Sequence, residues 1–243
     1  MHKKVKKAMI LAAGLGSRLK PWTDLHPKAL ARVNGKSLLQ RNIEYLQQAG
    51  IEDVIINVHH FADQIEDAIR ESGGWGSRIT ISDETDLVLE TGGGLKKAAA
   101  YFSDTEVFVL MNVDILTDMD LNAMIARHLA TQPLATLAVS DRMTSRYFLF
   151  DAEGQLCGWR NVQKGEEKIV RNAAPLYQKA FSGIHVMDTD LLSRIPFSGK
   201  FSMVDVYLAL AGDHPILSYD HTGAKLVDVG KPESIALAEA LFL

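Results

Sequence analysis

A glycine-rich turn that follows an apolar run is the part of this 243-residue chain whose residue types best fit a chemical task. The run Ala8–Leu11 predicts a buried parallel strand, and it leads into Ala-Ala-Gly-Leu-Gly-Ser-Arg at positions 12–18. Glycines lack a Cβ, so the backbone N–H groups of such a turn can approach phosphate oxygens. Arg18 and the later Lys28 add the cations that a polyphosphate needs. The combination predicts a nucleotide site.

Two commoner phosphate motifs do not fit this turn. A P-loop has a glycine, then any four residues, then Gly-Lys-Ser/Thr. Here Ser17 and Arg18 follow Gly14 and Gly16, so the Gly-Lys-Ser/Thr part is missing. The dinucleotide fingerprint requires a third glycine, and Leu19 stands in its place. The spacing therefore excludes both motifs.

Two acidic residues follow apolar runs far apart in the chain, at Asp114 and Asp228. If both runs are strands, both carboxylates lie near the carboxyl ends of strands, where open α/β sheets bind ligands. Mg²⁺ takes one or two carboxylates and leaves its other positions to water and phosphate. The pair therefore predicts a magnesium site, although each acid taken alone also fits a turn or a helix cap.

The elements that must position these residues alternate along the chain between strand and helix patterns. Helical patterns cover residues 37–49, 62–71, 94–102 and 121–130, and strand patterns cover 54–58, 79–81, 106–111 and 134–139. A hairpin at 147–159, a short strand at 169–170, strands at 181–186 and 226–229 and a helix from Pro232 follow. This order predicts a single α/β domain, a doubly wound, mostly parallel Rossmann-like sheet with a small β-rich insertion over the site.

Composition excludes several classes of protein. The formal net charge of −4 argues against a nucleic-acid surface, and no stretch reaches the about 18 apolar residues of a membrane span. The single cysteine, Cys157, excludes an intrachain disulfide. We therefore expect a cytoplasmic protein that binds neither nucleic acid nor membrane.

The full N-terminal string, Leu-Ala-Ala-Gly-x-Gly-Ser-Arg-x-x-Pro from Leu11 with Pro-Lys-x-Leu from Pro27, resembles the signature of the sugar-1-phosphate nucleotidyltransferases. Asn-Val-Asp at 112–114 and Val-Asp-Val-Gly at 227–230 resemble the two acidic motifs of this family. Val113 stands where relatives usually have glycine, and Lys231 where they commonly have threonine. The resemblance covers nearly the whole chain and implies a glycosyltransferase-A-like fold.

Two further strings resemble one branch of the family, the branch that includes N-acetylmuramate-1-phosphate uridylyltransferase. They are Leu-Glu-Thr-Gly-Gly-Gly at 89–94, which we expect to open a helix at Leu95, and Phe-Ser-Gly-Ile at 181–184. In that branch the first lies against the nucleobase and the sugar, and the second lines the sugar pocket. The resemblance implies a nucleotide-binding half at about 8–140, a sugar-binding part at about 141–230 and a closing helix at 231–243.

The resemblance also implies residue roles. The catalytic residues would be Arg18, Lys28 and Asp114, and the ligands of Mg²⁺ would be Asp114 and Asp228. The nucleotide would contact Leu11, Ala12, Ala13, Gly14, Gly16, Ser17, Arg18, Lys28, Glu84, Thr91, Gly92, Gly93 and Asn112. The sugar would contact Glu90, Ser182, Gly183 and Asp205.

The function implied is Mg²⁺-dependent transfer of a nucleotidyl group from a nucleoside triphosphate to a sugar 1-phosphate, with pyrophosphate as the second product. UTP with N-acetylmuramate 1-phosphate or a related hexosamine 1-phosphate is the leading pair. The alternatives are GTP with mannose or heptose 1-phosphate, dTTP with glucose 1-phosphate, and CTP with phosphocholine. A catalytically silent nucleotide-sugar sensor or regulatory subunit is the alternative from another class. The sequence leaves the choice between a monomer and a small homo-oligomer open.

Overall fold

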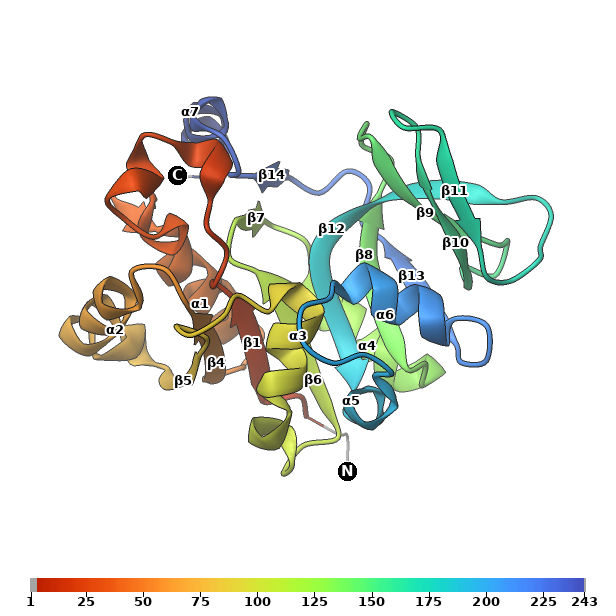
Figure 1. The fold of residues 1–243 in the computed structure, drawn as a ribbon, viewed down its shortest axis with the longest axis horizontal. Helices are drawn as coiled ribbons and strands as arrows, with labels where there is room; N and C mark the ends of the chain where they lie inside the picture. Colours follow the sequence, from red (N-terminus) through yellow and green to blue (C-terminus); the bar gives the residue numbers. More distant parts are fainter. Residues whose placement is uncertain (1–3, 243) are drawn as a thin grey trace.

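A ten-stranded mixed sheet forms the centre of the computed structural model, which describes residues 4–242 (Figure 1). The strands β1 (Lys7–Leu11), β4 (Asp53–Val58), β5 (Arg78–Asp83) and β6 (Val107–Asn112) run parallel, in the spatial order β5-β4-β1-β6. The long strand β12 (Tyr177–Asp188) then joins β6 in the antiparallel sense. The predicted doubly wound α/β architecture is confirmed, with four of its parallel strands adjacent in the N-terminal half.

Both faces of β1, β4 and β6 are buried, which explains their continuous apolar runs, whereas the edge strand β5 is largely exposed. In β1, Ala8 and Ile10 belong to one hydrophobic cluster, whereas Met9 and Leu11 belong to the other. The first cluster lies under helices α1 (Leu38–Gln48), α2 (Ala62–Glu71) and α4 (Leu121–Thr131). The second lies under α3 (Glu90–Lys97), α5 (Asp190–Arg194) and α6 (Met203–Leu210). None of the helices within residues 4–242 is both long and apolar enough to cross a membrane.

The antiparallel part of the sheet extends away from the parallel part, toward the upper right of Figure 1. It contains β9 (Arg146–Phe150), β10 (Leu156–Asn161) and β11 (Glu166–Ile169). β9 pairs with the first residues of β12, β10 pairs with β9, and β11 pairs with β10. β8 (Ala135–Ser140) pairs with β12 and, in parallel, with β13 (Ile216–Asp220). The predicted hairpin is confirmed, while α5, α6 and β13 come from a region for which the sequence patterns predicted no element.

Two small strand pairings and a helix complete the fold near the carboxyl ends of the parallel strands. β7 (Ile115–Thr117) pairs with β14 (Leu226–Asp228), and β2 (Arg32–Val33) pairs with β3 (Lys36–Ser37). Helix α7 (Pro232–Leu241) follows β14. In Figure 1 the red glycine-turn segment and the blue β14–α7 segment lie at the same edge of the molecule.

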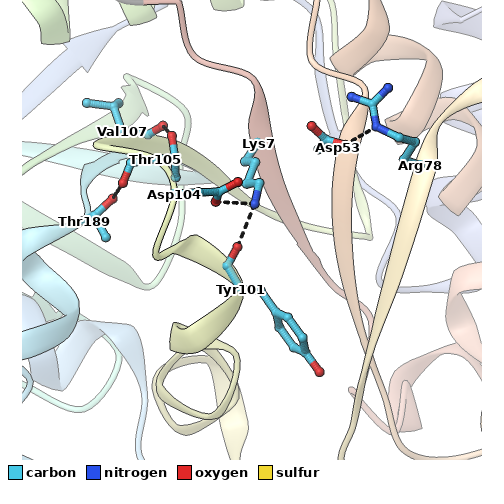
Figure 2. Close-up of polar contacts among 8 residues, drawn as sticks. All are labelled: Lys7, Asp53, Arg78, Tyr101, Asp104, Thr105, Val107 and Thr189. Atoms are coloured by element: carbon cyan, nitrogen blue, oxygen red, sulfur yellow. Dashed lines mark hydrogen bonds and ion pairs between the residues drawn. The ribbon is translucent and has the colours of Figure 1, made fainter.

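The opposite edge, at the amino ends of the strands, carries ion pairs between neighbouring elements (Figure 2). Lys7 pairs with Asp104 and donates to the carbonyl of Tyr101 at 3.0 Å. Arg78 Nε donates to Asp53 Oδ1 at 2.5 Å, which joins β5 to β4. These contacts join neighbouring elements at the amino ends of the strands.

Candidate active site

A cleft of about 510 Å³ lies at the carboxyl ends of β1, β4 and β6. Two other cavities are slightly larger, one beside α1 and the start of α4 (about 580 Å³) and one at the amino ends of the strands (about 630 Å³). Parallel α/β sheets bind ligands at the carboxyl ends of their strands, where the predicted cations and carboxylates also lie. The smaller cleft is therefore the candidate site.

Most of the residues predicted from the sequence line this cleft. They are Leu11, Ala12, Ala13, Gly14, Gly16, Ser17, Arg18, Lys28, Glu90, Thr91, Asn112 and Asp114. Folding thus brings together segments that are separated by about a hundred positions in the chain.

The glycine turn holds Lys28 close to the backbone. Gly16 has φ +60°, and a Cβ placed on it would lie 3.0 Å from Lys28 Cβ and 2.9 Å from Thr23 Cγ2. The Thr23 hydroxyl donates to the Gly16 carbonyl at 3.0 Å, which fixes this approach. A Cβ on Gly14, by contrast, would meet no atom within 4 Å. Gly16 therefore serves packing and backbone conformation, and Gly14 leaves open space for a ligand.

A buried amide–carboxylate pair supports the turn from behind. The N–H of Ala12 donates to Asn57 Oδ1 at 2.7 Å, and Asn57 Nδ2 donates to Glu84 Oε1 at 2.7 Å. Glu84 is fully buried and its other oxygen accepts the N–H of Leu89 at 3.2 Å. Glu84 therefore lies behind the cleft wall, where it orients Asn57, instead of lining the cleft as a direct ligand would.

The two predicted metal ligands come together across the β7–β14 pair. Asp228 is the register partner of Ile115, and the N–H of Val229 donates to the carbonyl of Asp114 at 2.8 Å. Lys28 forms an ion pair with Asp114. The pairing of β7 with β14 thus brings the carboxylates of Asp114 and Asp228 close to each other and to Lys28.

Arg18 and Asp228 meet at Gly230. A Cβ on this glycine would lie 2.7 Å from both Arg18 Nη2 and Asp228 Oδ1. Burial raises the pKa of Asp228, and the negative charge of Asp114 raises it further, while Lys28 and Arg18 oppose the shift. A divalent cation would relieve this repulsion. The donor set fits Mg²⁺, which needs only one or two carboxylates; residues 4–242 hold no group of three or more His, Cys, Asp and Glu side chains arranged for a metal.

The triple-glycine block does not open a helix at Leu95, as the sequence led us to expect. α3 begins at Glu90, so Gly92, Gly93 and Gly94 lie within its first turns and are buried. A Cβ on Gly93 would lie 2.3 Å from the Gly199 carbonyl oxygen, and one on Gly92 would lie 2.5 Å from the Phe201 ring. These glycines let the loop before α6 pack directly on α3, so Gly92 and Gly93 do not line the cleft.

Three residues predicted to contact the sugar also lie outside the cleft wall. Ser182 is fully buried, with its hydroxyl 2.7 Å from Nε2 of His221. Gly183 has φ +74°, and a Cβ there would lie 3.0 Å from Asn112 Nδ2. Asp205 forms the capping box of α6 and accepts the hydroxyl of Ser202 at 2.8 Å.

The sequence reasoning missed Asn57, Lys200 and Ser202, which all belong to the cleft wall. A signal for Asn57 was present, because an amide near the end of the apolar run 54–58 is unusual for a buried strand. Lys200 and Ser202 lie in a loop with no local pattern, and only its packing on α3 brings them to the site.

Val113, where the resemblance predicts glycine, has an ordinary backbone in this fold. It is not among the positive-φ residues of the described chain, and it is 4% exposed within the first hydrophobic cluster. Its N–H donates to the Leu11 carbonyl at 3.2 Å, and its carbonyl accepts Asn42 Nδ2 at 2.7 Å. The valine thus anchors the turn that carries Asp114.

Known proteins are similar to this chain in sequence and in fold. The N-acetylmuramate alpha-1-phosphate uridylyltransferase of Caulobacter vibrioides is 33% identical over 99% of this chain and 98% of its own length. The enzyme of the same name from Neisseria meningitidis is 42% identical over 48% of this chain and 50% of its own. The crystal structure of HddC from Yersinia pseudotuberculosis superposes with a TM-score of 0.79 at 24% identity, over 98% of this chain and 100% of that one.

The sequence model described as "Nucleotidyl transferase" matches residues 7–242, almost the whole chain. The match includes the glycine turn, both acidic motifs and the helix after β14. The resemblance noted in the sequence is thereby confirmed. The chain belongs to the nucleotidyl transferase family, as a sugar-1-phosphate nucleotidyltransferase.

Proposed function

We propose that this enzyme transfers the uridylyl group of UTP to N-acetylmuramate 1-phosphate, giving the UDP-sugar and pyrophosphate. The observation that supports the reaction is that Lys28, Arg18 and Asp114 line one cleft beside a glycine turn. Asp228 lies next to them, beside Gly230 of the cleft wall. The choice of substrates is supported by the relative from Caulobacter vibrioides, whose similarity extends over nearly the whole of both chains.

The reaction needs no general base on the enzyme, because the acceptor phosphate is already an anion near neutral pH. An acceptor oxygen forms a bond to the α-phosphorus of UTP, and the bond from that phosphorus to the bridging β-oxygen breaks. Pyrophosphate leaves with the electron pair of the broken bond. The enzyme must align the three groups in line and offset the repulsion between anions.

The residues of the cleft divide this work by position. Gly14 to Ser17 present backbone N–H groups, and Arg18 adds a cation for the phosphates that leave. Lys28, which neutralises Asp114 in the free protein, is placed to stabilise the α-phosphate as charge develops there. Ala12 and Thr91 also line the cleft, and we assign them to the nucleobase.

Asp114 and Asp228 would hold Mg²⁺. When bound, the ion would compensate the charge of the reacting phosphates. Because burial and mutual repulsion disfavour two free carboxylates here, these residues favour a cation between them.

A matrix of the four nucleoside triphosphates and dTTP against sugar 1-phosphates and phosphocholine, read by pyrophosphate release, tests the proposal. We expect the highest kcat/KM for UTP with N-acetylmuramate 1-phosphate, and loss of activity in EDTA. A higher kcat/KM for GTP with mannose or heptose 1-phosphate, dTTP with glucose 1-phosphate, or CTP with phosphocholine would replace the proposed substrates. No turnover with any pair would favour a silent nucleotide-sugar sensor.

A further inference from the structure

Lys200 is a cation of the cleft that lies apart from the phosphate machinery. Lys28 pairs with Asp114, and Arg18 lies beside Asp228, so both cations belong to the metal end of the site. Lys200 comes from the loop between α5 and α6, and its Nζ lies 3.6 Å from Oε1 of Glu90 at the start of α3.

The loop that carries Lys200 is fixed on both sides of this residue. The N–H groups of Gly92 and Gly93 donate to the carbonyl of Phe201 at 3.0 and 3.2 Å, and the N–H of Phe201 donates to the Leu89 carbonyl at 3.2 Å. On the other side of Lys200, Gly199 packs against Gly93 so closely that no Cβ fits between them. The backbone is therefore ordered, while the lysine side chain is 57% exposed.

The partner of Lys200 in the free protein holds it only weakly. Ion pairs between exposed side chains contribute about 0–1 kcal/mol, because water screens them and ordering costs entropy. The Glu90 carboxylate is itself about half exposed. A ligand anion that enters the cleft can therefore take over Lys200 at little cost.

We infer that Lys200 selects acceptors that carry a second anionic group, and that it binds the lactyl carboxylate of N-acetylmuramate 1-phosphate. This inference rests on the proposed function. The charges of UTP all lie on its phosphates, which Lys28, Arg18 and the glycine turn serve. N-acetylmuramate 1-phosphate has one anion besides its phosphate, and N-acetylglucosamine 1-phosphate lacks it. Lys200, the cation of the cleft that the phosphates do not need, thus matches the lactyl carboxylate, the one anion of the two substrates that is not a phosphate.

The test compares Lys200→Gln and Lys200→Arg with the wild-type enzyme on N-acetylmuramate and N-acetylglucosamine 1-phosphates. Hydrogen bonds to charged groups contribute about 1.5–3 kcal/mol, so we expect kcat/KM for the muramate substrate to fall about 10- to 100-fold in Lys200→Gln. For the glucosamine substrate, kcat/KM should change less than about threefold. The KM for UTP should stay the same. Lys200→Arg should keep the wild-type preference, because it retains the charge. Calorimetry should show the same loss in affinity for the muramate substrate.

Lys36→Gln is the matched control. Lys36 is also about half exposed and pairs with Glu44 at 2.7 Å, but it lies outside this cleft. It should leave both values of kcat/KM unchanged. Equal losses on both acceptors in Lys200→Gln, or a raised KM for UTP, would overturn the inference and leave the proposed function standing. A wild-type enzyme that uses only acceptors without a second anion would overturn both.

Discussion

At the scale of single residues, the site is a balance of four charges in partly buried surroundings. Lys28 and Arg18 face Asp114 and Asp228, so the free protein keeps its two carboxylates close together without a net charge. The balance changes when the phosphates of a nucleotide enter, because they bring several negative charges at once. Under the proposed mechanism each of the four side chains acts on the reacting groups, and substitutions can separate their effects on the rate.

The proposed metal site predicts the behaviour of Asp114→Asn and Asp228→Asn. Each substitution removes charge and keeps volume, so turnover should fall at least about 100-fold while the fold persists. Asp228→Asn should not lower the melting temperature, because burial and Asp114 already disfavour the charged form of Asp228. Pyrophosphate release and thermal melting measure the two effects. Near wild-type rates for both variants would show that the pair holds no essential metal.

Lys28→Met tests whether the lysine acts in the transition state. Loss of one preorganised group that faces developing charge lowers the rate about 10²- to 10³-fold, so kcat should fall far more than KM for UTP rises. Methionine retains most of the side-chain volume, and circular dichroism should confirm an unchanged fold. A change confined to KM would make Lys28 a ground-state contact.

At the scale of elements, the packing of α3 on the loop before α6 decides the shape of one wall of the cleft. The carbonyl of Gly199 occupies the space that a side chain at Gly93 would need. The Thr91 hydroxyl accepts the N–H of Met203 at 2.9 Å and ties α3 to the start of α6. Glycines inside a helix cost stability by themselves, so their place here reflects this close approach.

Gly93→Ala and Gly14→Ala should therefore have opposite effects. The first places a Cβ 2.3 Å from a backbone oxygen and should lower the free energy of unfolding by about 1–3 kcal/mol. The second meets no atom within 4 Å, so stability should be kept, while the added methyl group in the cleft should raise KM for UTP. Denaturant unfolding and steady-state kinetics distinguish the two. A stable Gly93→Ala variant would contradict the packing argument.

At the scale of the whole molecule, two hydrophobic clusters enclose the sheet and bury several polar groups with it. His128 on α4 lies 2.9 Å from the Thr136 hydroxyl on β8, and His185 on β12 contacts the Tyr207 hydroxyl on α6. Burial lowers the pKa of His128 to about 4 and that of His185 to about 3. Both rings are therefore neutral in the folded protein at neutral pH.

This burial makes the stability of the protein depend on pH. In the unfolded chain both histidines bind protons near their ordinary pKa of about 6.5, whereas the folded state resists protonation until about pH 4 or lower. The unfolded state thus binds more protons between these values, and stability should fall as the pH falls below about 6.5. Each histidine contributes a slope of up to about 1.4 kcal/mol per pH unit.

Urea unfolding at several values between pH 7.5 and pH 5 measures this slope. His128→Asn should flatten the dependence by the share of one histidine. His26, which is not buried in a hydrophobic cluster, offers a control as His26→Asn, and this variant should keep the full slope. An identical slope in His128→Asn and the wild type would refute the assignment.

Much of the fold and part of the site could be predicted from the sequence, because both depend on local patterns. Apolar runs predicted β1, β4 and β6, and the 3.6-residue period predicted α1 and α2 to within about two residues. The glycine turn, Arg18, Lys28 and the two aspartates each lie next to such a run, so the strands that follow from the pattern also place them. The division into nucleotide- and sugar-binding parts stays a prediction.

The sequence by itself indicated the reaction class, because its short strings of glycines, cations and acids resemble the motifs of one enzyme family. Only the tertiary structure decided which residues face the cleft. Glu84, expected as a nucleotide contact, and Ser182 of the Phe-Ser-Gly-Ile string are both buried, while Lys200 lies in the cleft wall without belonging to any motif. The physical reason is that exposure depends on what packs against a side chain, and the partners of these residues lie far away in the chain: Asn57, His221 and the glycines of α3.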